Sequence, residues 1–105
     1  MTASSMQARR LLVVEHSTEV ADWLAHEVRA LGCEVVIAHD GVEALHATME
    51  FLPDLILLDI LLPGMNGWEL ARRVRGLGQD VPPRLVAITS LGHEVHRQTP
   101  ANTVE

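Results

Sequence analysis

Four short runs of consecutive apolar residues constrain the fold of this chain more than any other feature. None of them alternates apolar with polar residues, as a strand with one face in water would do. The runs are Leu11–Val14, Val35–Ala38, Leu55–Leu58 and Leu85–Ile88. Unbroken apolar runs of this length are typical of strands that are buried on both faces, as in a parallel sheet.

The segments between these runs show helical spacing. Each begins with a residue that commonly caps a helix, and then carries apolar residues three or four positions apart. The expected caps are Thr18, Asp40 and Asn66. The expected inward faces are Val20, Leu24, Val28 and Leu31 in the first helix, Val42, Leu45 and Met49 in the second, and Leu70, Val74 and Leu77 in the third. We also expect Trp23 and Trp68 to be packing residues.

Strand and helix therefore alternate three times before a final strand. Parallel strands joined by right-handed crossovers build an α/β fold with a doubly wound sheet. The chain of 105 residues is short enough for a single domain, and it contains no internal repeat or linker. We expect a flexible N-terminus over residues 1–8, a folded domain over 9–92 and an irregular tail over 93–105.

The charge and the cysteine content exclude several classes of protein. A net charge of −6 argues against direct contact with nucleic acid or with an anionic membrane. The single Cys33 cannot form an internal disulfide, and no secretory signal precedes the first apolar run. The longest apolar stretch is too short to span a membrane and contains Asp59. We therefore expect a cytoplasmic protein.

Polar residues follow each apolar run, at the position where ligands bind in open α/β sheets. Glu15 and His16 follow the first run, Asp59 follows the third and Thr89 follows the fourth. A lone carboxylate beside a hydrophobic core costs several kcal/mol unless another group pairs with it. If the second strand lies outside the first, these four residues converge on one pocket, which gives Asp59 a chemical role.

At these positions the sequence resembles the response-regulator receiver domain of two-component signalling. The resemblance extends from about Arg10 to Gly92, and its most specific part is the loop that begins at Asp59. The segments that carry it are Val13–His16, Asp40–Leu45, Asp59–Gly67 and Ala87–Ser90. It implies a flavodoxin-like receiver fold with strand order 2-1-3-4, here without the fifth strand and fifth helix.

The resemblance also implies a function in phosphorelay signalling. Asp59 would accept a phosphoryl group from a histidine kinase or a phosphotransfer protein. Glu15, Asp59 and the backbone carbonyl of Leu61 would hold Mg²⁺, and the Thr89 hydroxyl would hydrogen-bond the phosphoryl group. The chain would then be a signalling domain and not an enzyme, apart from phosphotransfer to its own aspartate.

The sequence departs from the family pattern in two places. His16 stands where a second acid is usual, and imidazole is a poor ligand for Mg²⁺, so we expect weakened metal binding and regard His16 as a doubtful ligand. All eight basic residues are arginine, so the lysine that the family places after its fifth strand is missing. With no fifth strand expected, the fourth becomes an edge through which the chain can form a homodimer.

Three other interpretations stay open at this stage. A pseudo-receiver would use the same fold to bind a protein partner without phosphorylation, and His16 and the missing lysine favour it. A truncated gene product would fold marginally. A nucleotide-binding enzyme is the weakest alternative, because the turn after the first run has no glycine with which to cradle phosphates.

Overall fold

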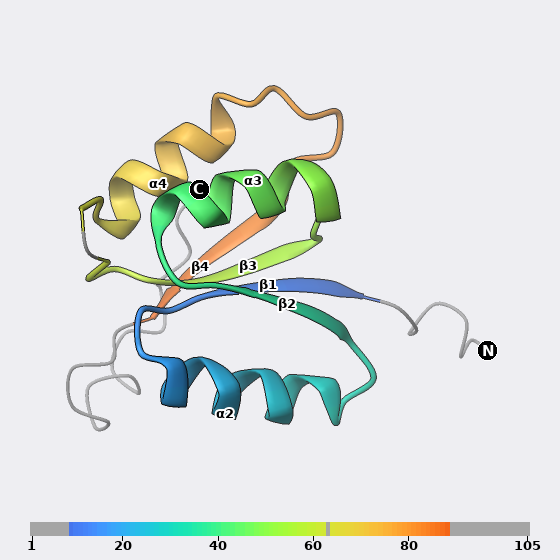
Figure 1. The fold of residues 1–105 in the computed structure, drawn as a ribbon. Coiled ribbons are helices and arrows are strands. Elements are labelled where there is room, and N and C mark those ends of the chain that lie inside the picture. The colour runs from blue at the N-terminus through green and yellow to red at the C-terminus, as the bar shows by residue number, and fades with distance from the viewer. Residues whose placement is uncertain (1–8, 63, 89–105) are drawn as a thin grey trace.

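The computed structural model describes residues 9–62 and 64–88, which form a three-layer α/β domain (Figure 1). Strands and helices alternate as the apolar runs predicted. The elements are β1 (Arg10–Val14), α2 (Thr18–Arg29), β2 (Glu34–Ala38), α3 (Gly41–Phe51), β3 (Leu55–Asp59), α4 (Gly67–Arg75) and β4 (Arg84–Ile88). The predictions for residues 1–8, for Thr89 and for the segment 93–105 lie outside the described residues.

The four strands form one parallel sheet in the order β2-β1-β3-β4, which confirms the predicted order. Val14 at the end of β1 lies beside Ala38 of β2 and Leu58 of β3. Asp59, the last residue of β3, lies beside Ile88 of β4. The carboxyl ends of all four strands therefore meet at one edge of the sheet.

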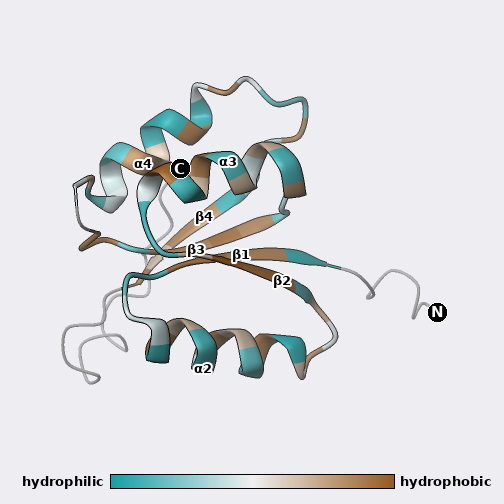
Figure 2. Cartoon of the chain, in the orientation of Figure 1, coloured by the Kyte–Doolittle hydropathy of each residue, from teal (hydrophilic) through white to brown (hydrophobic). Residues whose placement is uncertain are grey.

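Helix α2 covers one face of the sheet, and α3 and α4 cover the other (Figure 1). Figure 2 shows the strands as the most hydrophobic part of the domain, while the helices mix hydrophobic and hydrophilic residues. Two clusters of buried residues form the core. The cluster under α3 and α4 includes Leu12, Val14, Ile56, Leu58, Leu70, Val74 and Leu85. The smaller cluster under α2 includes Leu11, Val13, Ala21, Ala25 and Val35.

Helix α2 begins one residue earlier than the prediction. Ser17 is the N-cap, and its Oγ accepts a hydrogen bond of 3.2 Å from the Val20 N–H, whereas Thr18 is already helical. Leu24 and Val28 pack against the core as expected. The prediction was wrong for Leu31, which is 80% exposed because the helix ends at Arg29 and the chain turns there.

Helix α3 is capped by Asp40 and packs Leu45 against the core, as predicted, but its fully buried residues differ from the prediction. Gly41, Ala44 and Thr48 are the buried residues, whereas Val42 and Met49 are exposed. These small residues let the helix lie close to its neighbours, a requirement that hydrophobic spacing alone does not reveal. Val42 and Met49 are consequently left at the outer side of α3.

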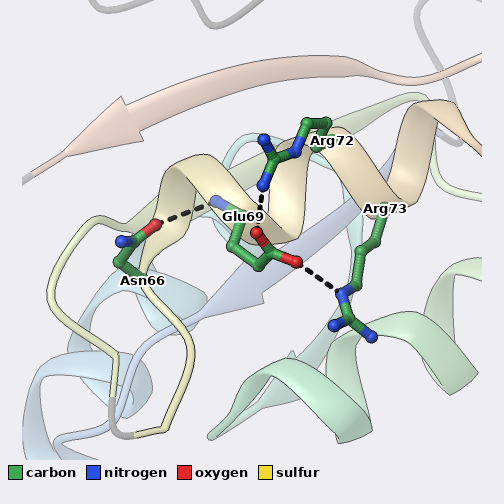
Figure 3. A network of polar contacts seen from close by, with 4 residues as sticks. All are labelled: Asn66, Glu69, Arg72 and Arg73. Atoms are coloured by element: carbon green, nitrogen blue, oxygen red, sulfur yellow. Dashed lines mark hydrogen bonds and ion pairs between the residues drawn. The ribbon is translucent and has the colours of Figure 1, made fainter.

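Helix α4 follows the prediction more closely. The Asn66 Oδ1 accepts a hydrogen bond of 2.9 Å from the Glu69 N–H, and Leu70 and Val74 are buried (Figure 3). Trp68 is 53% exposed, and Trp23 of α2 is 61% exposed, so neither tryptophan is the packing residue we expected. Among the described residues, no helix is long and apolar enough to cross a membrane.

Candidate functional site

Two buried carboxyl groups lie together at the carboxyl edge of the sheet. Asp59 ends β3, and Glu15 directly follows β1. The pairing of Val14 with Leu58 makes the two acids neighbours across adjacent strands. Each is only 2% exposed. Burial of two adjacent acids is costly, so this arrangement indicates a site for a cation or a proton.

Backbone N–H groups orient both side chains. The Leu61 N–H donates to Asp59 Oδ1 over 3.0 Å, and the Ser17 N–H donates to Glu15 Oε2 over 3.1 Å. The other oxygen of Glu15, Oε1, is buried and has no hydrogen-bond donor among the described residues. A cation, or a proton shared with Asp59, would satisfy this buried oxygen.

The electrostatics of Glu15 show the cost of this arrangement. Burial raises the pKa of Glu15, while the hydrogen bond from Ser17 lowers it. The charge of Asp59 raises the pKa of Glu15 further, as does a hydrogen bond that the two carboxyl groups share when one is protonated. A bound cation would offset the repulsion between the two carboxylates, as a shared proton does when no cation is bound.

The two carboxyl groups fit a magnesium ion. Mg²⁺ keeps several waters and is usually held by only one or two carboxylates, at short oxygen distances. No group of three or more His, Cys, Asp or Glu side chains lies close enough to hold a metal within residues 9–62 and 64–88. His16 is exposed and acts on Glu15 only as a weak charge that lowers its pKa. Glu15 and Asp59 are adjacent buried acids at this edge of the sheet.

His39 is a neighbour of the site that the sequence did not single out. Its Nδ1 lies 3.0 Å from the backbone oxygen of Glu15, and because a carbonyl only accepts, Nδ1 carries the proton. The backbone N–H of His39 donates to Glu43 Oε1 over 2.9 Å. His39 therefore fixes the end of β2 against the turn that carries Glu15. The feature of the sequence that could have indicated this role is the position of His39 directly after an apolar run.

The loop after Asp59 is held by backbone contacts. The Ile60 N–H donates to the Ile88 oxygen, and the Gly67 N–H donates to the Ile60 oxygen over 2.8 Å. A Cβ at Gly67 would lie 2.5 Å from Leu58 Cδ1 and 2.8 Å from Ile60 Cα. Only glycine allows α4 to begin this close to the end of β3, so Gly67 sets the path of the loop beyond Asp59.

Comparison with known proteins identifies the family. A model of the response regulator receiver domain matches residues 11–102. The chain belongs to the response-regulator receiver family. Receiver domains are signalling modules of two-component systems, for which phosphorylation and Mg²⁺ are standard.

Solved receiver structures share the fold described above. A receiver domain (CheY-like) from Methylobacillus flagellatus has a TM-score of 0.76 at 26% identity, covering 84% of this chain and 78% of that chain. The response regulator protein TrrA from Thermotoga maritima, in complex with Mg(2+)-BeF, has a TM-score of 0.71 at 32% identity. That match covers 81% of this chain and 72% of TrrA.

Curated relatives are longer than this receiver chain. Response regulator MprA of Mycobacterium tuberculosis is 40% identical over 73 residues, which is 70% of this chain and 32% of MprA. DNA-binding response regulator MtrA of Mycobacterium leprae is 42% identical over 67 residues, which is 64% of this chain and 30% of MtrA. The chain thus spans about a third of the length of these relatives.

The structure brings together some of the predicted site residues. Glu15 and Asp59 adjoin as predicted, and the backbone of Leu61 contacts Asp59 through its N–H. The role of the Leu61 carbonyl stays a prediction, as does that of Thr89, which lies outside the described residues. The contributions of Ser17, His39 and Gly67 are new; Ser17 acts through its backbone N–H, His39 through its imidazole and Gly67 through its lack of a Cβ, and sequence spacing specifies none of these contacts.

Proposed function

We propose that this receiver domain accepts a phosphoryl group on Asp59 from a phosphohistidine of a histidine kinase or phosphotransfer protein. The observation that carries the proposal is a buried carboxylate at the end of β3, oriented by the Leu61 N–H and adjoined by Glu15. An Asp59 oxygen forms a bond to phosphorus while the bond from phosphorus to the histidine nitrogen breaks. The bonding pair stays on the departing nitrogen, and a proton carried by the other ring nitrogen of the phosphohistidine lets the imidazole leave in its neutral form.

The carboxyl pair would bind the metal that the transfer requires. When bound, Mg²⁺ neutralises charge on the phosphoryl oxygens and on the carboxylates. Glu15 and Asp59 supply the acidic ligands, and we assign the third protein ligand to the carbonyl of Leu61. Because His16 replaces a second acid, we expect weaker Mg²⁺ binding than in receivers that have both acids.

The hydroxyl of Thr89 completes the proposed site. Thr89 directly follows Ile88, which pairs with Asp59 across β3 and β4. We assign it a hydrogen bond to a phosphoryl oxygen, which would make the segment after β4 sensitive to the phosphorylation of Asp59.

A phosphodonor experiment tests the function directly. The chain is incubated with acetyl phosphate and either Mg²⁺ or Mn²⁺, and the intact mass is measured. We expect one added phosphoryl group, stable in acid and labile in base, that is lost in Asp59→Asn. Asp54→Asn is the matched control, because Asp54 precedes the same strand at its opposite end and is exposed. No adduct with either metal would overturn the proposal.

A pseudo-receiver is the second candidate function. The exposed His16, which replaces an acid, favours the pseudo-receiver. Among the described residues, the site then offers two acidic side chains and no cluster of three possible metal ligands. A pseudo-receiver would bind a protein partner independently of phosphorylation. In that case Asp59→Ala leaves partner binding unchanged, and Mg²⁺ does not quench the emission of Trp68.

We also propose that the chain self-associates through β4. Within the described residues β4 pairs with β3 alone, so its other edge is a candidate for strand pairing. Sedimentation over a range of protein concentrations tests this, and a monomer at every concentration would refute it. The cytoplasmic location, and the absence of direct binding to nucleic acid, stay predictions.

A further inference from the structure

A groove between α3 and α4 has neither Glu15 nor Asp59 in its lining. It has a volume of about 430 Å³. Its lining comprises Val42, Leu45, His46, Met49, Met65, Arg73, Gly76 and Leu77. The α3 residues recur at helical spacing, and two of them, Val42 and Met49, are apolar side chains that the core of the domain does not use. We propose that this groove binds the apolar face of an acidic amphipathic helix from a partner protein.

Exposed apolar side chains form the α3 wall of the groove. Val42 is 62% exposed and Met49 is 50% exposed, although residues of these types are usually buried. Leu45, between them, is partly buried against the core. Apolar residues spaced over two turns of one helix present a surface that matches a second helix laid alongside, since anchors on such a helix have the same spacing.

The opposite wall carries one arginine, Arg73, which sets the charge of the occupant. Helix α4 carries three arginines and one glutamate in a chain whose net charge is −6. Arg73 lines the groove, and Figure 3 shows its side chain reaching from α4 toward α3. Its Nε donates to Glu69 Oε2 over 2.9 Å. The acids of these helices, Glu43 and Glu50 on α3 and Glu69 on α4, are not part of the lining.

One carboxylate holds two guanidinium groups on α4. Glu69 also accepts a hydrogen bond from Arg72, and Arg73 and Arg72 both lower the pKa of Glu69 (Figure 3). Arg72, Arg73 and Glu69 together therefore keep one uncompensated positive charge. The hydrogen bond to Glu69 also fixes the direction in which Arg73 presents its remaining N–H donors. An acidic side chain flanking the apolar anchors of a partner helix would pair with it.

Met65 connects the groove to the loop that follows Asp59. Its side chain lines the groove and also fills the space beside Gly41, where a Cβ would lie 2.7 Å from its Sδ. Methionine adapts its shape to different partners, which suits a residue at a docking surface. A helix bound in the groove would therefore contact the same loop whose Leu61 N–H orients Asp59.

The binding test uses two synthetic peptides of about 15 residues. Both carry leucines three and four residues apart on one face; one is flanked by glutamates and the other by lysines. Fluorescence anisotropy of the labelled peptides is measured against the unphosphorylated chain. We expect the glutamate peptide to bind and the lysine peptide to bind at least about tenfold more weakly.

Matched variants locate the site. We expect Met49→Ser and Arg73→Ala each to weaken binding of the glutamate peptide about tenfold. Val81→Ser removes an exposed apolar side chain outside the groove and should change binding less than about twofold. Circular dichroism checks that the variants, all at exposed positions, stay folded.

Three results would overturn the inference. Equal binding of the two peptides would exclude a charge-selective groove. Equal losses for Met49→Ser and Val81→Ser would place the peptide elsewhere. Self-association that Met49→Ser abolishes would show that a second copy of this chain, and not a partner helix, occupies the groove.

Discussion

The contact between Gly67 and the end of β3 gives a stability prediction with a matched control on the same helix. In Gly67→Ala the new Cβ would lie 2.5 Å from Leu58 Cδ1 and 2.8 Å from Ile60 Cα. Carbon atoms pack best about 3.5–4.0 Å apart, so the contact is too short by about 1 Å. Leu58 is fully buried and cannot turn aside, and Ile60 contributes backbone. Either α4 or the loop after Asp59 must therefore move.

Such overpacking costs about 1–3 kcal/mol of unfolding free energy, or about 5–20 °C in Tm for a domain of this size. Gly76→Ala is the control, because Gly76 has φ −69° and its Cβ would meet no atom closer than 3.4 Å. That variant should be neutral or gain about 0.5 kcal/mol. Thermal unfolding followed by circular dichroism measures both. Equal melting temperatures for the two variants would refute the close approach of α4 to β3.

Three further predictions follow from named contacts. Glu15→Gln should raise stability at neutral pH by about 1–3 kcal/mol, since an amide can donate to Asp59, and should abolish stabilisation by Mg²⁺. Burial and Asp59 raise the Glu15 pKa above its ordinary value of 4.5. The stability of the wild type should therefore fall as pH rises through the raised pKa. Urea unfolding of Glu15→Gln should show no such fall. Asn66→Ala should lose about 1 kcal/mol through the lost cap on α4, which urea unfolding measures; no loss would contradict the hydrogen bond to Glu69. Leu31→Ser should change stability by less than about 0.5 kcal/mol, whereas Leu12→Ala in the core should cost about 2–5 kcal/mol, and similar losses would contradict the burial described here.

The sheet was predictable because its signal is local. Four unbroken apolar runs mark strands buried on both faces, and the chain order with right-handed crossovers leaves few arrangements of those strands. The juxtaposition of Glu15 and Asp59 followed from that order, since both residues come directly after neighbouring strands. The acidic pair of the site could therefore be located from the sequence.

The faces of the helices were harder to predict, because hydrophobic spacing favours large side chains. In α3 the buried residues are the smaller Gly41, Ala44 and Thr48, and the larger Val42 and Met49 stay outside. Contacts made by backbone atoms could not be predicted either, since the spacing of residues in the sequence does not tell which backbone N–H donates to a carboxylate. The hydrogen bonds to Asp59 and Glu15 could be found only from coordinates.

The exposed tryptophans determine what intrinsic fluorescence can report about this domain. Trp23 and Trp68 are the only tryptophans, and the chain has no tyrosine. Both indole rings already contact water in the folded state, being 61% and 53% exposed, so unfolding should shift their emission little. Trp68 lies in the first turn of α4, two residues after the cap that ends the Asp59 loop. Intrinsic fluorescence is thus poorly suited to following unfolding and well suited to following events at the domain surface.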